Sequence, residues 1–124
     1  MKQKKYLISI CTPTFNSEKY LEKTIKSVID QGYKNIQFII IDGGSTDKTI
    51  KIIKKYKKHI NYWVSEKDRG IYDAWNKGLK VAKGEIFGVL SSDDYYYDNT
   101  FSTVNKYFIK YPKINFLFGA TKLK

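Results

Sequence analysis

The stretch Ile86-Phe87-Gly88-Val89-Leu90-Ser91-Ser92-Asp93-Asp94 joins an apolar run directly to a polar turn that ends in two acids. The apolar part is typical of a buried strand, and the polar part begins where that strand would open into a loop. Hard cations such as Mg²⁺ and Mn²⁺ prefer carboxylate and phosphate oxygens, so this pair can hold a metal-bound phosphate. A turn or cap whose carboxylates accept backbone N–H bonds explains the pair too, and the pair alone favours that simpler interpretation.

Short apolar strands alternate with amphipathic helices on both sides of this stretch, which is typical of βαβ units that build a mostly parallel sheet. The predicted strands are 6–11, 36–41, 62–64, 86–90 and 114–118. Helices are predicted between them, and Asn16 or Ser17 is available to cap the first. The last helix is predicted to start at Asp98, with Pro112 marking its end.

The helix predicted over 71–83 has the clearest amphipathic pattern in the chain. Gly84 is suited to its C-terminal cap. The helical spacing places six residues on one inward stripe, namely Ile71, Ala74, Trp75, Gly78, Leu79 and Ala82.

Length and composition indicate one domain over residues 1–124, of 14.5 kDa and 42% hydrophobic residues. No apolar stretch approaches the roughly 20 residues that span a bilayer, and we expect a cytoplasmic protein. The single cysteine, Cys11, lies inside an apolar run, where a buried small hydrophobic side chain is the expected role.

A formal net charge of +11 suggests an anionic partner. Many lysines fall on outward positions of the predicted helices, which is typical of a solvated face, and the sequence has no recognisable nucleic-acid motif. We therefore expect no nucleic-acid partner. A nucleotide diphosphate and an acidic lipid surface remain open as partners.

Three polar clusters follow predicted strands, at the edge where ligands of parallel sheets bind. They are the loop 12–17, the turn that begins Asp42-Gly43-Gly44, and Ser92-Asp93-Asp94. Asp42 has two open interpretations: its carboxylate accepts a hydrogen bond from N3–H of a uracil base, or it belongs to a strand-to-helix turn. Neither a phosphate-binding P-loop nor a G-x-G-x-x-G turn is present, so P-loop ATPases and ordinary dinucleotide dehydrogenases are disfavoured.

The segment 65–70 precedes the third helix, where backbone N–H groups and the positive end of the helix dipole can meet phosphate oxygens. Arg69 is interpreted either as an additional phosphate contact or as an exposed loop arginine. Asp73 lies in the first turn of the helix, where a solvated position explains it equally simply.

Taken together, four motifs resemble the inverting nucleotide-sugar glycosyltransferases of family 2, which have the GT-A fold. Pro13-Thr14-Phe15-Asn16 is similar to the family's P-T-Y-N opening, and 42–47 is similar to its D-x-S-x-D turn. Residues 70–78 resemble its glycine-to-asparagine helix segment, and 92–94 resemble its D-x-D element. The order and spacing of the motifs carry the resemblance, which covers nearly the whole chain.

The resemblance implies an α/β fold, a GT-A (Rossmann-like) mostly parallel sheet flanked by helices, truncated relative to the family. It implies a hexosyltransferase-like enzyme that binds an NDP-sugar donor, expected to be a UDP-sugar, through Mg²⁺ or Mn²⁺ and transfers the sugar to an acceptor hydroxyl with inversion. Asp94 is the implied metal ligand, Asp93 the implied ribose contact and Asp42 the implied base contact. The other implied nucleotide-binding residues are Pro13, Phe15, Glu18, Gly70, Asp73 and Ser92.

One departure from the family matters for activity: its catalytic base is an acidic residue well beyond the D-x-D element, and no residue up to Lys124 corresponds to it. We expect a fragment that keeps the nucleotide-binding half, with the base beyond Lys124. The implied acceptor is a saccharide or a lipid-linked intermediate of cell-envelope polysaccharide synthesis, met at the inner face of the membrane. The alternative is a non-catalytic binding or assembly module that docks on a partner or on an anionic membrane surface.

Overall fold

The structure is a computed structural model, and it describes residues 4–114. Its described part contains a four-stranded, all-parallel sheet in the order β3-β2-β1-β4. The strands are β1 (Ile8–Thr14), β2 (Ile36–Asp42), β3 (Tyr62–Ser65) and β4 (Ile86–Val89). The α/β class and the mostly parallel sheet are therefore confirmed, whereas the strand predicted at 114–118 lies outside the described residues except for its first position.

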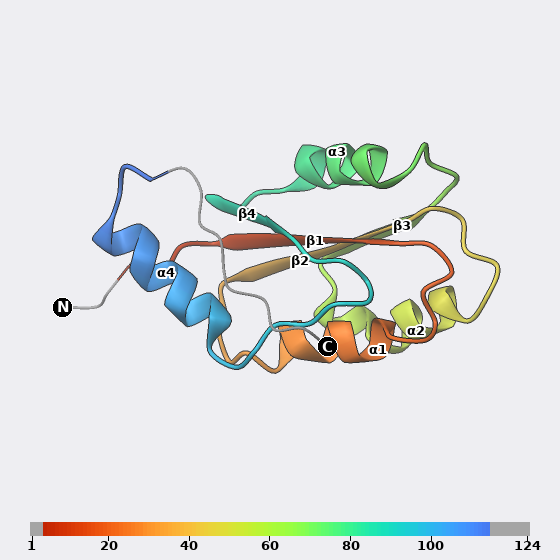
Figure 1. Ribbon diagram of the computed structural model, residues 1–124, viewed down its shortest axis with the longest axis horizontal. Helices are drawn as coiled ribbons and strands as arrows, with labels where there is room; N and C mark the ends of the chain where they lie inside the picture. The colour runs from red at the N-terminus through yellow and green to blue at the C-terminus, as the bar shows by residue number, and fades with distance from the viewer. Residues whose placement is uncertain (1–3, 115–124) are drawn as a thin grey trace.

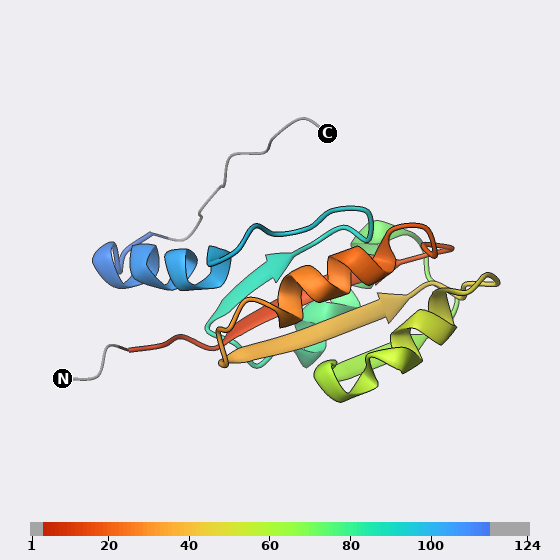
Figure 2. The ribbon, with the colours of Figure 1, turned by 90° about the horizontal axis from the view of Figure 1, so that it is seen from below.

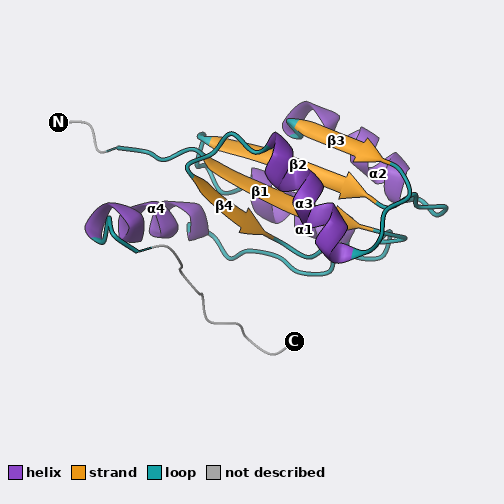
Figure 3. Cartoon of the chain, turned by 90° about the horizontal axis from the view of Figure 1, so that it is seen from above, coloured by secondary structure: helices purple, strands orange, loops and turns teal. Residues whose placement is uncertain are grey.

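Helices cover both faces of the sheet, α1 and α2 on one and α3 on the other (Figures 1 and 3). Their bounds are α1 (Leu21–Ile29), α2 (Thr49–Lys55), α3 (Ile71–Val81) and α4 (Thr100–Lys110), with a short 3-10 turn η1 (Lys57–His59) after α2. α4 lies at the end of the sheet where the strands begin, opposite to the loops that follow them (Figure 2).

The central strands form the core because both of their faces are covered. On the side of α1 and α2, Ile10 and Phe38 pack with Leu21 and Ile25. On the α3 side, Cys11 packs in a second cluster with residues of β2 and α3. Burial on both faces explains why β2 is an almost uninterrupted apolar run, as parallel sheets require, and it confirms the buried role of Cys11.

The inward stripe predicted for α3 is only partly correct. Ala74 and Gly78 are buried, but Ile71 and Leu79 are exposed. The contact with the sheet is so close that only small residues fit there: a Cβ at Gly78 would lie 3.1 Å from the Cβ of Cys11. The large side chains consequently lie beside the contact rather than in it.

Three predicted helix ends are wrong. α3 already ends at Val81, and Gly84 instead donates its N–H to Ser9 Oγ at 2.8 Å. A Cβ at Gly84 would lie 2.7 Å from the carbonyl oxygen of Leu7, so glycine is required by a close approach of two backbones. α1 begins at Leu21, later than a cap at Asn16 or Ser17 would place it, and has no side-chain cap. α4 starts at Thr100 with Asn99, not Asp98, as its N-cap residue.

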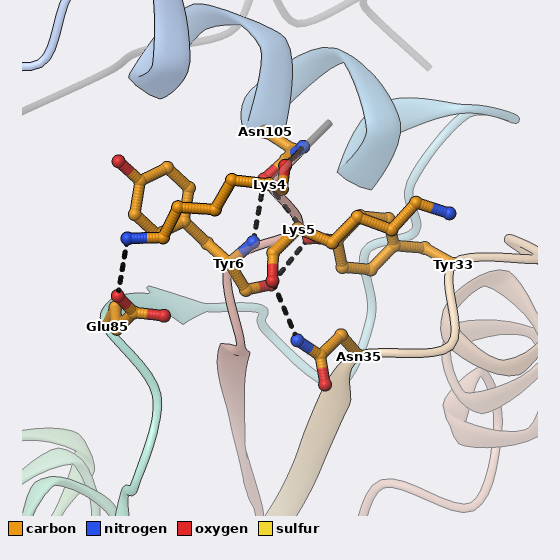
Figure 4. Close-up of polar contacts among 7 residues, drawn as sticks. All are labelled: Lys4, Lys5, Tyr6, Tyr33, Asn35, Glu85 and Asn105. Atoms are coloured by element: carbon orange, nitrogen blue, oxygen red, sulfur yellow. Dashed lines mark hydrogen bonds and ion pairs between the residues drawn. The ribbon is translucent and has the colours of Figure 1, made fainter. Parts of the chain in front are cut away.

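Asn105 fastens α4 to the segment that precedes β1 (Figure 4). Its Oδ1 accepts the N–H of Tyr6 at 2.9 Å, and its Nδ2 donates to the carbonyl of Lys4 at 3.0 Å. The Tyr33 hydroxyl donates to the Tyr6 carbonyl, and Asn35 Nδ2 donates to the Lys5 carbonyl at 2.8 Å. Because Asn105 is buried, these bonds hold α4 firmly against the rest of the domain.

Candidate functional site

The loops after the four parallel strands all lie at one edge of the sheet. The chain steps from β1 to β2 and β3 on one side and returns to β4 on the other, so strand order reverses between β1 and β4. Open α/β sheets bind ligands in the crevice at this point. A cavity of about 450 Å³ lies there and is called the switch-point cavity below. Its lining residues are Pro13, Thr14, Phe15, Gly43, Lys67, Asp68, Gly70, Ile71, Ala74, Ser91 and Ser92.

The N-terminus of α3 forms one wall of the switch-point cavity, through Gly70, Ile71 and Ala74. Gly70 has a φ of 109°, which side-chain-bearing residues rarely adopt, and its N–H donates to Asp68 Oδ1 at 3.0 Å. Lys67 lines the same cavity. A helix N-terminus beside a lysine is suited to phosphate oxygens, and Asp68, which lines the same cavity, adds one negative charge to this wall.

Asp42 lies beneath the cavity, fully buried at the end of β2. Its two carboxylate oxygens accept five hydrogen bonds of 2.6 to 3.0 Å. The donors are the hydroxyls of Thr14, Ser45 and Ser65 and the backbone N–H groups of Gly44 and Ser45. This arrangement fixes the turn after β2, as the turn interpretation of Asp42 expects.

Burial and hydrogen bonding act in opposite directions on Asp42. Burial alone raises the pKa of the carboxyl, but the hydrogen bonds from Ser45, Thr14 and Ser65 outweigh it, and the net pKa lies below the usual value. The side chain is therefore held as a carboxylate, the form that can accept all five bonds.

The loop after β1 is joined to the turn after β2 by side chain to backbone bonds. Asn16 has a φ of 46°; its N–H donates to Ser45 Oγ at 2.8 Å and its Oδ1 accepts the N–H of Thr46 at 2.8 Å. The N–H of Glu18 donates to Asp47 Oδ2 at 3.2 Å. These bonds make the two loops one rigid rim, on which Phe15 stands 62% exposed.

A second cavity of about 330 Å³, called the acidic cavity below, contains the acidic pair. Its lining residues are Tyr20, Lys23, Thr24, Asp93, Asp94 and Tyr95. Lys23 Nζ lies 4.2 Å from the centre of the Tyr95 ring. Since Ser91 and Ser92 line the switch-point cavity, one short loop carries residues of both cavities.

The structure brings together some of the predicted site residues and separates others. Pro13, Phe15, Gly70 and Ser92 share the switch-point cavity, whereas Asp93 and Asp94 share the acidic cavity. The remaining three predicted residues line neither cavity. Glu18 is exposed and Asp42 is buried at the end of β2. Asp73 accepts the N–H of Arg69 at 3.0 Å, and its carboxylate lies 3.8 Å from Lys77 Nζ.

Lys67 lines the switch-point cavity, whereas Arg69, which the sequence left open as a phosphate contact or an exposed loop arginine, is not among its lining residues. Both lie in the segment that the sequence marked as a phosphate-binding loop, and only the path of the loop decides which of them faces the cavity. Thr24 was missed as well, because a threonine inside a helix carries no sequence signal of its own.

Asp93 and Asp94 have a donor chemistry that fits Mg²⁺ or Mn²⁺. Such ions are commonly bound by one or two carboxylates while substrate phosphates and water complete the shell. Among residues 4–114, no group of three or more His, Cys, Asp or Glu side chains forms a cluster able to hold a metal ion. Asp93 and Asp94 line the same cavity of about 330 Å³, and two carboxylates are within the number that such ions take from a protein.

In the part of the chain that the structure describes, no helix is both long and apolar enough to cross a membrane.

Comparison with known proteins agrees with this arrangement. Residues 9–122 match the sequence profile of the family described as Glycosyl transferase family 2. Over 101 residues the chain is 44% identical to an uncharacterized glycosyltransferase of Rickettsia typhi, an alignment that covers 80% of this chain and 31% of that protein. It is 39% identical over 95 residues to the putative teichuronic acid biosynthesis glycosyltransferase TuaG of Bacillus subtilis, covering 73% of this chain and 37% of TuaG.

A solved structure supports the fold. The crystal structure of S. aureus TarS 1-349 in complex with UDP-GlcNAc matches with a TM-score of 0.76 and 29% identity, over 83% of this chain and 31% of that chain. The present chain thus spans about a third of the length of the proteins it matches. The motifs, the parallel sheet with its switch-point cavity and the profile match agree: the chain belongs to glycosyl transferase family 2, with the GT-A fold.

Proposed function

We propose that this chain is the nucleotide-sugar-binding half of an inverting glycosyltransferase, and that it binds a UDP-sugar together with Mg²⁺ or Mn²⁺. The observation that carries the proposal is the switch-point cavity, which is lined by Phe15 on the rim, by Lys67 and by the α3 N-terminus. Similarity to TarS, which has been solved with UDP-GlcNAc, supports the choice of a uridine nucleotide.

In this proposal the two walls of the site bind different parts of the donor. The rim residues Pro13 and Phe15 contact the nucleoside, and Asp42 acts from below by holding the turn after β2 in place. Lys67 and the N–H groups at the start of α3 bind phosphate oxygens. Ser92 and Asp93 contact the nucleotide from the β4 side. Glu18 and Asp73 remain predicted contacts on the periphery.

Asp94 is the proposed ligand of the metal, with Asp93 beside it. The ion, when bound, neutralises charge that develops on the departing diphosphate. The protein's own contribution is to hold the diphosphate against positive groups, so that the leaving oxygen is stabilised as the bond to the sugar breaks.

Calorimetric titration of the chain with UDP, once in the presence of Mn²⁺ and once in the presence of EDTA, tests the proposal. We expect Mn²⁺ to tighten UDP binding to the wild-type chain, and we expect Asp94→Ala to abolish that tightening because the metal loses its carboxylate ligand. Asp98→Ala is the matched control, since Asp98 is exposed and lines neither cavity. Absence of UDP binding by the wild-type chain, with or without metal, would refute the proposal.

Sugar transfer is a separate expectation. The resemblance places the base that activates the acceptor beyond the acidic pair, so we expect the 124-residue chain to bind nucleotide and to transfer sugar poorly or not at all. The measurement is release of UDP and of glycosylated acceptor from UDP-sugars by the purified chain. Robust transfer would show that a base lies within these residues.

The net charge of +11 favours a second candidate, docking on an anionic membrane surface where a lipid-linked acceptor is met. Sedimentation with vesicles that contain anionic lipid, against neutral vesicles, tests it. Binding to anionic vesicles in a protein that does not bind UDP would favour the assembly-module alternative.

A further inference from the structure

The acidic pair lies on a segment that has no regular secondary structure. After β4 the chain turns at the site edge of the sheet and runs back alongside α1 to reach α4 at the opposite end (Figure 2). Backbone groups in such a segment need partners other than a ladder or a helix. The side chains that supply these partners determine where the carboxylates lie.

Thr24, on α1, holds the part of this segment that carries the two acids. Its side chain is buried, and its hydroxyl lies within hydrogen-bonding distance of the carbonyl oxygens of Ser92, at 3.0 Å, and Asp94, at 2.5 Å. A hydroxyl has one proton to donate, and the carbonyl oxygen of Tyr20 lies 3.4 Å away as well, so Thr24 donates to one of these carbonyls at a time. The backbone on both sides of Asp93 lies within reach of this hydroxyl. Ser17 Oγ lies 2.8 Å from Ser92 Oγ and extends the contact toward the switch-point cavity.

Two further polar side chains, one on α1 and one just past its end, bond backbone groups of the same segment. The N–H of Tyr96 donates to Ser27 Oγ at 3.1 Å. Gln31, just past the end of α1, donates from Nε2 to the carbonyl of Tyr97 at 2.7 Å, and its Oε1 accepts the N–H of Phe101 at 3.2 Å. Phe101 is in the first turn of α4, so these bonds reach the far end of the segment.

The spacing of Thr24, Ser27 and Gln31 along the chain explains why all three reach the same segment. Positions 24, 27 and 31 are three and four apart, so they follow one line along the helix. The segment 92–101 runs beside this line, and each side chain bonds a backbone group further along it. We name Thr24, Ser27 and Gln31 the α1 polar stripe.

We propose that the α1 polar stripe consists of positioning residues, which hold the loop 92–97 so that Asp93 and Asp94 face the metal-bound diphosphate. The inference rests on the proposed function for its ligand, the metal-bound diphosphate. Its structural half, that the stripe holds the loop 92–97 in place, does not depend on that function. The bonds of the stripe named above go to backbone groups of the loop, so its loss leaves both carboxylates present and changes the geometry in which they meet a ligand.

Amide hydrogen exchange tests the structural half without any nucleotide. In Ser27→Ala the N–H of Tyr96 loses its acceptor, and we expect its exchange to be about fivefold faster or more, in line with the net free energy of one hydrogen bond. The amide of Ile40, buried in β2, serves as internal control and keeps its wild-type rate. Unchanged protection of Tyr96 would overturn the inference.

Nucleotide binding tests the functional half, through the ratio of UDP affinities with Mn²⁺ and with EDTA. In Thr24→Val, which keeps the side chain's shape and removes its hydroxyl, we expect this ratio to fall by about tenfold, as for outer partners of metal ligands, with little change in the affinity measured in EDTA. Thr24→Ser restores a hydroxyl and is expected to recover the ratio. Thr103→Val, at an exposed position of α4, is the matched control.

The outcomes separate this inference from the proposed function. If the wild-type chain shows Mn²⁺-enhanced binding and Thr24→Val keeps it, the inference is wrong and the proposed function stands. If Thr24→Val weakens binding equally with and without metal, the residue has only a general structural role, and the inference is again wrong. If the wild-type chain does not bind UDP, the proposed function fails and the positioning role for a metal-bound diphosphate fails with it, whatever hydrogen exchange shows about the loop.

Discussion

At the scale of a single residue, Asp42 shows how a motif position becomes a structural anchor through burial. Asn keeps one oxygen as an acceptor and turns the other into an NH₂ donor that faces N–H and O–H groups. We expect Asp42→Asn to lower the free energy of unfolding by about 2–3 kcal/mol, because the donors on the replaced oxygen lose their acceptor, and Oδ2 alone accepts from Gly44, Ser45 and Ser65. Urea denaturation of both proteins at neutral pH measures the difference.

The pH dependence of this difference follows from the lowered pKa of Asp42. Its stabilising contribution is complete above the ordinary carboxyl pKa of about 4 and is lost as the pH falls through the lower pKa of the folded state. The gap between wild type and Asp42→Asn should therefore narrow in acid. Asp98→Asn, at an exposed position, is the control; a gap that is constant with pH would contradict the assignment.

At the scale of an element, α3 depends on small residues for its contact with the sheet. A Cβ on Gly78 would meet both the Sγ and the Cβ of Cys11. We expect Gly78→Ala to destabilise the domain by about 1–3 kcal/mol, since backbone must shift to make room. Thermal unfolding measures the loss.

A second variant separates this close contact from helix propensity. Cys11→Ala introduced into Gly78→Ala removes the obstructing Sγ, and we expect it to recover part of the stability. Lys80→Ala, exposed on the same helix, is expected to leave stability nearly unchanged. If Cys11→Ala does not relieve the destabilisation by Gly78→Ala, the close contact with Cys11 is not its cause.

At the scale of the whole molecule, the net charge of +11 should attract a nucleotide diphosphate over several ångströms. Salt screens this attraction, so we expect UDP affinity to fall as NaCl is raised from low to high concentration. Uridine carries no phosphate and is the control ligand, because its affinity should respond much less. Equal salt dependence for UDP and uridine would show that charge does not contribute.

Much of the fold could be predicted from the sequence because the strands and helices have strong apolar periodicities. The parallel sheet follows from the alternation of short apolar runs with amphipathic segments. The predictions of detail failed where packing is closest: the stripe of α3 was predicted too wide, and Gly84 is a backbone contact rather than a helix cap. Both failures come from contacts with β1 and the residue before it, and a local sequence pattern contains no information about such a neighbour.

The family, the class of fold and the motif residues could be read from the residues alone, since these depend on residue types in a fixed order along the chain. Which of the motif residues line the same cavity depends on the folded chain. Folding places Lys67 rather than Arg69 at the wall of the switch-point cavity and buries Asp42. It also brings Thr24 against the backbone of the loop 92–97. The reason is physical: the direction of a side chain is set by the path of its loop and by partners far away in the chain.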